Sequence, residues 1–386
     1  MSNIGKTILI LGNGLDLAHG LPTTYSHFLE FCQQINTIQT PSNGIIKITS
    51  NSKKIHEIPA TTEDLLALSN LLKNNVWYLY FKELYDKKLM RGENWIDFES
   101  EIRYIIKTID ENSVSLTMPW NDVINKIIVN YPLELNLNIF DDKFHSAKDQ
   151  IINKSTPNQV TVKDFREMTF NDLERLTRAL EIYLTFVEKI PISDKLPKLA
   201  FMSPDYVISF NYTDTYERIY KRGDVYHIHG KAVANRSIED NNMVLGIDEY
   251  WGENERNEKI NFTIFKKFSQ RIQKHTGNKS YKILNEIREI FNENKKQLQE
   301  KKRLYPPRSL EDGISKIYIF GHSLDSTDKD ILASFIGDES TSVKVFCKDK
   351  GTEGELIANT IKLITEEKLL EKSNHFPSKL EYEVLK

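Results

Sequence analysis

The chain has 386 residues, of which 39% are apolar, and its 52 Lys and Arg residues nearly balance its 55 Asp and Glu residues. The formal charge of −3 gives no overall attraction to nucleic acid or to an anionic membrane. No apolar run approaches the ~20 residues that a membrane-spanning helix needs, so we expect no membrane contact. At about 100–200 residues per domain, this length predicts two domains or one large domain with an insertion.

The two cysteines, Cys32 and Cys347, are far apart in the sequence, and neither belongs to a Cys-x-x-Cys pair. They cannot form a four-thiolate zinc site, and no other feature indicates a disulfide framework. The first residues also lack the apolar segment of a signal peptide. We therefore expect a reduced, cytoplasmic protein that holds no metal.

The first predicted element is a buried strand at residues 7–11, a continuous apolar run that stops at a glycine turn. A helical region follows, in which Thr61 and Asp64 form a capping-box pattern. Apolar residues recur there at helical spacing over residues 61–84, 95–106 and 173–187. Residues 132–165, rich in Asn, Asp, Lys and Pro, are predicted to form an irregular connection.

Further apolar runs predict strands at residues 206–210, 225–228, 243–245, 317–320 and 343–347. Several end at a glycine and a polar loop, which is typical of parallel strands buried on both faces. The pattern predicts an α/β fold, with a Rossmann-like, mostly parallel sheet and a large α-helical insertion. We expect a discontinuous nucleotide-binding core of residues 1–30 and 201–386, with residues 31–200 as the insertion.

Residues 265–303 carry twelve Lys and Arg against four Asp and Glu, a local charge of +8 on a segment with helical spacing. Such a segment is usually the solvated face of a helix. The alternative is a nucleic-acid-binding surface, so nucleic acid is not excluded as a partner. Its contributors would include Lys295, Lys296, Lys301, Lys302 and Arg303.

The turn after the first strand is the strongest local signal of a binding site. Gly12 and Gly14 permit a tight turn whose backbone N–H groups can approach a phosphate. The alternative is a turn whose glycines only satisfy backbone geometry, because Leu17 replaces the third glycine of a dinucleotide fingerprint. Asp16 could cap a helix or accept hydrogen bonds from a ribose. A break at Gly20-Leu21-Pro22 makes this a bent loop at a strand end, where ligands bind in open α/β sheets.

Two later strand ends also carry polar residues. Asn211 and Tyr212 follow residues 206–210, and the Asn211 amide could hold sugar hydroxyls or close a turn through its own backbone. His227 and His229 share one face of the next strand, but no third metal ligand with suitable spacing is evident. His229 lies at the strand exit, where it suits acid–base chemistry near neutral pH.

The strand at 317–320 ends at Gly321-His322-Ser323-Leu324-Asp325, whose small polar groups can cap a helix or contact a ligand. Asp325 replaces the second glycine of a nucleophile elbow, so a serine hydrolase is not predicted. Asp97 and Glu99 lie near the start of another predicted helix. Glu99 is more simply explained by an ion pair with Arg103 on that helix.

Taken in order, these motifs resemble the sirtuin-like nucleotide-binding fold. That fold has a glycine turn with a downstream Gly-Ile-Pro, an Asn after a buried strand, a His-Gly and a late glycine-serine loop. The first motif with Thr23, Tyr25 and Phe28, together with Trp95-x-Asp97-x-Glu99, more specifically resembles the AbiH family of bacterial abortive-infection proteins. The resemblance spans residues 7–30, 95–99, 205–250 and 316–332.

The resemblance implies that Gly12 to Asp16 bind the pyrophosphate and adjoining ribose of NAD. It also implies that Asn211 holds the nicotinamide ribose or a water, and that His229 is the catalytic base. The other residues placed at the nucleotide are Gly20, Leu21, Pro22, Tyr212, Gly321, His322, Ser323 and Asp325. In the turn, Asn13 and Asp16 replace an alanine and a serine of the sirtuins.

Two distant cysteines cannot build the zinc module of the deacylating sirtuins, so the implied activity is hydrolysis of NAD to nicotinamide and ADP-ribose in anti-phage defence. Glu99 and Asp97 are further candidates for that site. One alternative is a non-catalytic sensor of NAD or ADP-ribose, and another is a nucleic-acid-directed effector using residues 265–303. A homo-oligomer, a partner defence protein or a phage-derived trigger is expected to take part.

Overall fold

The computed structural model describes residues 4–37, 44–50, 53–130, 139–140, 160–192, 194–252, 254–300 and 313–385. The chain divides into two compact units, each built from separate stretches of sequence. The sheet unit comprises Met1–Leu21, Ile190–Ala232 and Arg271–Lys386, and the helical unit comprises Pro22–Lys189 and Val233–Gln270. The predicted division differs in three places, because it assigned residues 22–30 and 233–270 to the core and residues 190–200 to the insertion.

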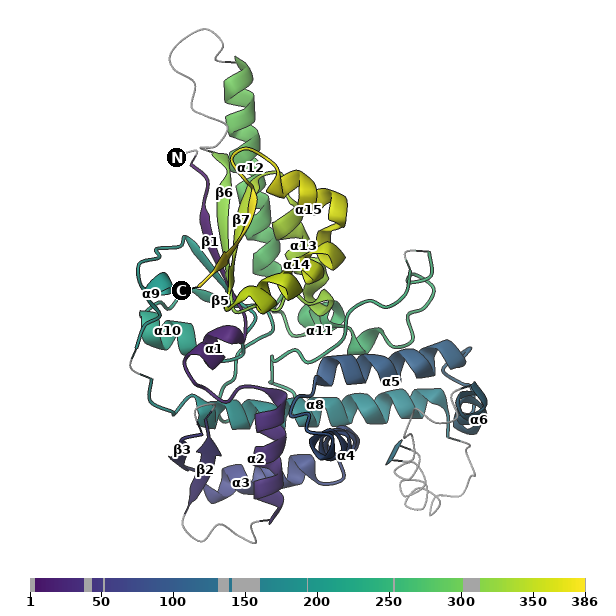
Figure 1. Ribbon diagram of the computed structural model, residues 1–386. Coiled ribbons are helices and arrows are strands. Elements are labelled where there is room, and N and C mark those ends of the chain that lie inside the picture. Colours follow the sequence, from purple (N-terminus) through teal and green to yellow (C-terminus); the bar gives the residue numbers. More distant parts are fainter. Residues whose placement is uncertain are drawn as a thin grey trace. The chain divides into compact units, whose positions relative to one another are not determined.

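The described residues of the sheet unit form a six-stranded sheet in the order β5-β4-β1-β6-β7-β8. Its strands β1, β6 and β7 lie side by side in Figure 1. The strands are β1 (Thr7–Leu11), β4 (Tyr206–Ser209), β5 (Val225–His227), β6 (Ser315–Phe320), β7 (Thr341–Cys347) and β8 (Leu380–Val384). All five neighbouring pairs are parallel, which confirms the predicted α/β fold class. The chain builds outward from β1 through β4 to β5 and then returns to the other side of β1, as in a Rossmann-like sheet.

Helices cover both faces of this sheet. The side chains of each strand alternate between the two faces, so one strand contributes apolar residues to two cores. Ile8 and Ile10 of β1 belong to the core beneath α12 (Asn278–Glu300), α13 (Lys329–Gly337), α14 (Lys350–Ile364) and α15 (Glu366–Ser373). Leu9 and Leu11 belong to a second core with α1 (Gly14–Ala18), α9 (Pro197–Ala200) and α10 (Thr215–Tyr220). Burying one such side chain contributes about 1.5–3 kcal/mol.

The strand predicted at residues 243–245 was wrong. Met243, Val244 and Leu245 are buried but lie in the helical unit outside any described strand. The nearby Ile247 forms an isolated parallel bridge to Lys266. A short buried apolar run cannot be assigned to a strand from its pattern alone. The sequence analysis also missed β8, whose alternating Leu-Glu-Tyr-Glu-Val sequence suits a half-exposed edge strand.

The helical unit contains α2 (Tyr25–Thr37), α3 (Thr62–Leu72), α4 (Val76–Met90), α5 (Phe98–Asn112), α6 (Trp120–Asn130) and α8 (Val162–Val187). It also contains a hairpin of β2 (Ile45–Thr49) and β3 (Ile55–Pro59), which was not predicted, and the short helix η1 (Thr263–Phe265). The helix α11 (Lys267–Gln273) begins in this unit and ends in the sheet unit.

Two local features of the helical unit follow directly from the sequence. The capping box at Thr61 and Asp64 is confirmed. The apolar stretch at 61–84 is interrupted, because the Asn75 side chain accepts a hydrogen bond from the Tyr78 N–H and caps a new helix. Most of the irregular connection predicted at residues 132–165 lies outside the described residues, and α8 begins at Val162.

Candidate functional site

Four of the predicted motifs follow the carboxyl ends of β1, β4, β5 and β6, which are neighbours in the sheet. Because these strands are parallel, their carboxyl ends lie along one edge. Successive strands are added on one side of β1 as far as β5 and then on its other side from β6 onward, so the strand order switches between β1 and β6. Open α/β sheets bind ligands at such a switch point. This edge of the sheet is therefore the candidate site.

The turns after β1 and β6 pack backbone against backbone. A Cβ atom on Gly14 would lie 2.5 Å from Gly321 Cα, and one on Gly12 would lie 2.5 Å from His322 Cα. Gly321 itself has φ +68°, which disfavours other residues. The Gly12 N–H donates to the Phe320 carbonyl at 3.0 Å, and the Gly14 N–H donates to the Gly321 carbonyl at 2.7 Å. Close packing of the two turns thus explains all three glycines.

A buried cluster of two histidines around one carboxylate lies at this edge. His229 Nε2 is 3.1 Å from Asp328 Oδ1, and His322 Nε2 is 3.5 Å from Asp328 Oδ2. The Phe210 ring meets both imidazoles edge to face, at centroid distances of 5.3 Å to His229 and 4.4 Å to His322. All three polar residues are less than 10% exposed. The sheet therefore brings His229 and His322 together, 93 positions apart in the sequence.

Backbone contacts determine the tautomer of His322. The Leu324 N–H donates to His322 Nδ1 at 2.9 Å, so the neutral ring carries its proton on Nε2, the nitrogen that faces Asp328. Leu324 adopts φ +57°, an uncommon conformation for a non-glycine residue, which places this N–H against its neighbour's ring. His322 thus holds Oδ2 of the Asp328 carboxylate in place and has a structural role.

Asn211 is the least satisfied polar residue at this edge. It is 5% exposed, and within the described part of the chain neither Oδ1 nor Nδ2 of its side chain has a hydrogen-bond partner. Its backbone is held firmly, because its N–H donates to Ser209 Oγ at 3.1 Å and its carbonyl accepts from His227 Nδ1 at 2.8 Å. Buried polar groups are almost always hydrogen-bonded, so this amide indicates a missing ligand or water.

His227 has a structural role. Its Nδ1 lies against the Asn211 carbonyl and its Nε2 lies 2.8 Å from Glu217 Oε1. The Lys231 ammonium also donates to Glu217, at 3.1 Å. Burial raises the pKa of Glu217, but the bonds from His227 and Lys231 outweigh it and hold that pKa below the usual value. His227 thus supports the loop that carries Asn211.

Asp16 lies in the first turn of α1 and is 1% exposed. Its Oδ2 accepts a hydrogen bond from Thr213 Oγ1 at 2.7 Å, while Oδ1 is buried and has no partner in the described residues. Burial raises the pKa of Asp16 to about 6, although the hydroxyls of Thr215 and Thr213 and the Arg218 charge act in the opposite direction. The side chain does not cap α1.

The other residues predicted at the nucleotide serve varied local roles. Gly20 has φ +76°, Leu21 is buried, and Pro22 begins the helical unit, where its carbonyl accepts a hydrogen bond from Tyr183 Oη. Asn13 is exposed, and the Tyr212 ring lies 6.4 Å from the His229 ring. The Ser323 carbonyl accepts from Asn359, and Asp325 caps the short helix η3 (Ser326–Asp328).

Asp97 and Glu99 lie in the helical unit. Asp97 caps α5, since its side chain accepts hydrogen bonds from the Glu99 N–H and from Ser100 Oγ. Glu99 Oε2 is 2.8 Å from Lys267 Nζ, and both side chains are largely buried. Arg103, the helix partner suggested by the sequence, is instead 2.8 Å from Asp248.

The basic segment predicted at 265–303 is divided between the two units, since the helical unit ends at Gln270 and the sheet unit resumes at Arg271. Several of its cations pair with carboxylates, including Lys266 with Glu249, Lys267 with Glu99, Arg271 with Asp330, Arg288 with Asp338 and Lys295 with Glu339. Lys301, Lys302 and Arg303 lie outside the described residues.

Sequence analysis missed two members of the candidate site. Neither Asp328 nor Thr213 is among the site residues predicted from the sequence. Both follow a site residue closely, Asp328 six positions after His322 and Thr213 two positions after Asn211. Polar side chains just beyond a strand end were therefore the available signal.

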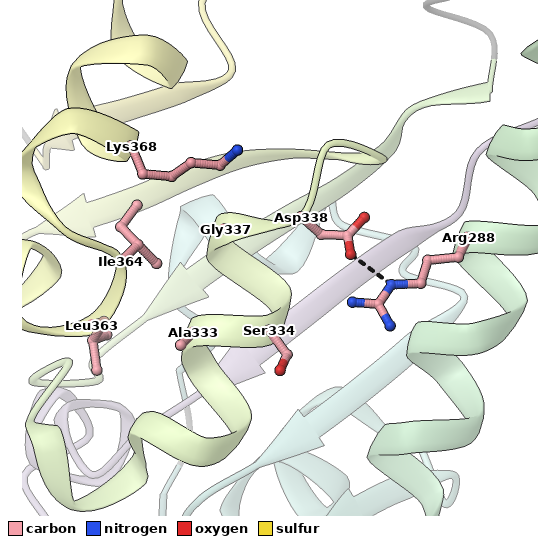
Figure 2. Close-up of a pocket in the computed structure, with 8 residues that line it drawn as sticks. All are labelled: Arg288, Ala333, Ser334, Gly337, Asp338, Leu363, Ile364 and Lys368. Atoms are coloured by element: carbon pink, nitrogen blue, oxygen red, sulfur yellow. Dashed lines mark hydrogen bonds and ion pairs between the residues drawn. The ribbon is translucent and has the colours of Figure 1, made fainter. Parts of the chain in front are cut away.

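Three further observations concern the described residues. They contain no group of three or more His, Cys, Asp or Glu arranged to hold a metal ion. None of their helices is both long and apolar enough to cross a membrane. Figure 2 shows a pocket of about 270 Å³ in the sheet unit, lined in part by α13 and by the ion pair of Arg288 with Asp338. No predicted site residue lines this pocket.

The fold and the polar strand ends define a Rossmann-like α/β protein with a candidate site at the carboxyl edge of its sheet. The chain belongs to the AbiH family, since the model of the family described as bacteriophage abortive infection AbiH matches residues 8–348. That match includes β1, β4, β5 and β6 with the turns that follow them. No curated protein and no solved structure matched the chain.

Proposed function

We propose that this chain is an abortive-infection effector with a sirtuin-like core, and that it hydrolyses NAD at the nicotinamide–ribose bond. The proposal rests on the arrangement of three side chains at the carboxyl edge of the sheet. There His229 lies 3.1 Å from the Asp328 carboxylate, and the buried Asn211 amide has no partner in the described residues. Membership of the AbiH family supplies the setting of phage defence.

The proposed reaction needs groups that act on a ribose and on a water. The bond from the ribose C1′ atom to nicotinamide breaks, and its electron pair neutralises the pyridinium charge of the leaving group. Positive charge develops on the ribose as in glycoside hydrolysis. The water oxygen then bonds to C1′ and loses a proton, so the products are nicotinamide, ADP-ribose and one proton.

His229 suits the role of the base. A carboxylate beside Nε2 favours the tautomer that carries its proton on that nitrogen, which makes Nδ1 the basic atom. In this proposal, Nδ1 takes a proton from the attacking water or from a ribose hydroxyl. The Asn211 amide can both donate and accept, so it orients that water or hydroxyl. Asp328 acts through His229 and is a positioning residue.

The nucleotide is NAD or a close relative, with the sheet edge as its site. A phage-derived trigger, a partner defence protein or self-assembly would switch the effector on. The same site without turnover would be a sensor of NAD or ADP-ribose. A nucleic-acid-directed effector receives less support, because five cations of the 265–303 segment already pair with carboxylates.

The test measures nicotinamide released from NAD by the purified full chain, alone and with an extract of phage-infected cells as the trigger. We expect His229→Ala and Asn211→Ala to lower the rate by about 10²–10⁴-fold, the usual contribution of a positioned base. Asp328→Asn should lower it by about 10–10²-fold, as loss of a partner that orients a functional histidine does.

His375→Ala is the matched control, because His375 is exposed, and this variant should keep the wild-type rate. Full activity of His229→Ala would contradict the assignment of the base. Binding of NAD with no release of nicotinamide in the presence of infected-cell extract would contradict hydrolysis and support the sensor.

A further inference from the structure

The turn after β1 is poorly suited to hold a phosphate. Phosphate cradles direct free backbone N–H groups at the ligand. Here the N–H groups of Gly12, Gly14 and Leu15 donate to the carbonyls of Phe320, Gly321 and Gly12, at 3.0, 2.7 and 3.0 Å respectively. The helix α1 that follows has only five residues, so it adds little dipole of its own.

Asp16 strengthens this conclusion. Its carboxylate is 1% exposed and lies two residues beyond Gly14, so an ionised Asp16 would repel a phosphate bound at the turn. One oxygen is occupied by the Thr213 hydroxyl at 2.7 Å, and the other, Oδ1, is buried without a partner in the described residues. A buried carboxylate oxygen in this state needs a hydrogen-bond donor.

A second unpartnered group belongs to the same edge. β1 and β4 are adjacent, with Leu11 in register with Ser209, so Asp16 and Asn211 follow neighbouring strand ends. Thr213 connects the two regions, because it lies two residues after Asn211 and donates to Asp16. Together they offer a carboxylate acceptor and an amide that both donates and accepts. Hydroxyl groups of a sugar satisfy this combination, whereas a phosphate does not.

We propose that Asp16 Oδ1 accepts a hydrogen bond from a ribose hydroxyl of the bound nucleotide, and that the phosphates lie away from the Gly12–Gly14 turn. The inference rests on the proposed function, because that proposal supplies NAD as the nucleotide. Asp16 is then a specificity-determining residue. It selects a ribose with a free hydroxyl over a deoxyribose or a ribose phosphorylated at that position.

Calorimetric titration of the full chain with NAD and ADP-ribose tests this contact, alongside analogues that lack the 2′-hydroxyl of one ribose or the other. The wild type should bind one deoxy analogue at least about 10-fold more weakly than its parent. Asp16→Ala should bind both parents at least about 10-fold more weakly than the wild type does. It should also distinguish that analogue from its parent by less than about 2-fold, since directly interacting groups are non-additive.

Two further variants keep the result interpretable. Asp16→Asn preserves an acceptor for Thr213 and should fold even where Asp16→Ala does not, and it should discriminate less than the wild type. Asp194→Asn changes an exposed aspartate of the sheet unit and should leave every affinity unchanged. Equal losses for each deoxy analogue in the wild type and in both Asp16 variants would overturn the proposed contact.

Inorganic pyrophosphate separates the two possible positions of the phosphates. If Asp16→Ala binds pyrophosphate about 10-fold more tightly than the wild type, the phosphates lie at the turn and the inference fails. Coupling between Asp16 and a ribose hydroxyl without release of nicotinamide would support this inference and overturn NAD hydrolysis. Release of nicotinamide without coupling between Asp16 and a ribose hydroxyl would support NAD hydrolysis and overturn this inference. If no probe binds, both proposals are overturned.

Discussion

Two buried asparagines, Asn75 of the helical unit and Asn211 at the carboxyl edge of the sheet, differ in how their side chains are hydrogen-bonded. In the helical unit, the buried Asn75 amide donates to the Asp172 carbonyl at 2.7 Å and accepts from the Tyr78 N–H at 3.1 Å. At the sheet edge, the buried Asn211 amide has no partner in the described residues. Buried polar groups are costly unless they are paired, so a fold keeps an unpaired one where a function requires it.

Two buried carboxylates, Glu99 and Asp16, differ in a similar way. Glu99 of the helical unit pairs with Lys267 at 2.8 Å, whereas Asp16 of the sheet unit has one oxygen without a partner in the described residues. We therefore expect Asn75 and Glu99 to contribute to stability, and we propose that Asn211 and Asp16 bind the ligand. Four substitutions at these residues test that expectation.

Glu99→Ala should have the largest effect on stability. It removes the carboxylate 2.8 Å from the Lys267 ammonium, whose side chain is 3% exposed. Losing one partner of a buried ion pair costs about 3–5 kcal/mol, so we expect the helical unit to melt on the order of 10 °C lower. Scanning calorimetry of the full chain measures this shift.

Glu255→Ala, which alters an exposed glutamate of the same unit, is the control and should melt like the wild type. A Glu99→Ala variant of unchanged stability that no longer releases nicotinamide would contradict the structural assignment. It would place Glu99 in the catalytic site instead.

Asp16→Asn should stabilise the protein at neutral pH. Burial raises the pKa of Asp16 from 3.8 to about 6, so the folded state holds a proton that the unfolded state releases over this range. The wild type therefore loses stability as pH rises from about 4 to about 6, and the deficit persists above that range. The full linkage amounts to about 1–3 kcal/mol and is absent from the Asn variant.

Denaturant unfolding at pH 4 and pH 7.5 measures this difference. The gain from Asp16→Asn should be present at pH 7.5 and nearly absent at pH 4, with Asp194→Asn as the exposed control. An Asp16→Asn variant that is less stable than the wild type at pH 7.5 would show that the carboxylate is paired for stability.

The two asparagines give the smallest but most closely matched effects. Asn75→Ala leaves the Tyr78 N–H without its cap and should cost about 1–3 kcal/mol. Asn211→Ala removes an amide without partners in the described residues, so the free energy of unfolding should change by less than about 1 kcal/mol. Chemical denaturation of both variants tests the pair, and equal losses would contradict the contrast.

The sequence predicted the parts of the fold that depend on local patterns. The apolar runs at β1, β4, β6 and β7 identified the parallel sheet, because strands buried on both faces carry unbroken apolar sequence. The run at 243–245 is also unbroken apolar sequence and was therefore wrongly predicted as a strand. It is buried because it packs in the helical unit. The weakly apolar edge strand β8 left no comparable signal.

The candidate site was predictable only in part. Strand-end motifs pointed to Asn211, His229 and Asp16, since parallel strands bring their ends to one edge. The partners of these residues depend on contacts between distant segments. Thus the neighbour of His229, Asp328, lies 99 positions away, and the partner of Glu99 is Lys267 rather than Arg103 on its own helix. No local pattern encodes such pairs.

The most direct test of the account is a thermal-shift panel of NAD, NADP, ADP-ribose and ATP on the wild type and on Asn211→Ala. A ligand that binds the folded state raises its melting temperature by mass action. The account predicts that NAD or ADP-ribose stabilises the wild type, and that Asn211→Ala keeps the melting temperature of the free protein but loses the shift. An equal shift in both proteins, or no shift with any nucleotide, would contradict it.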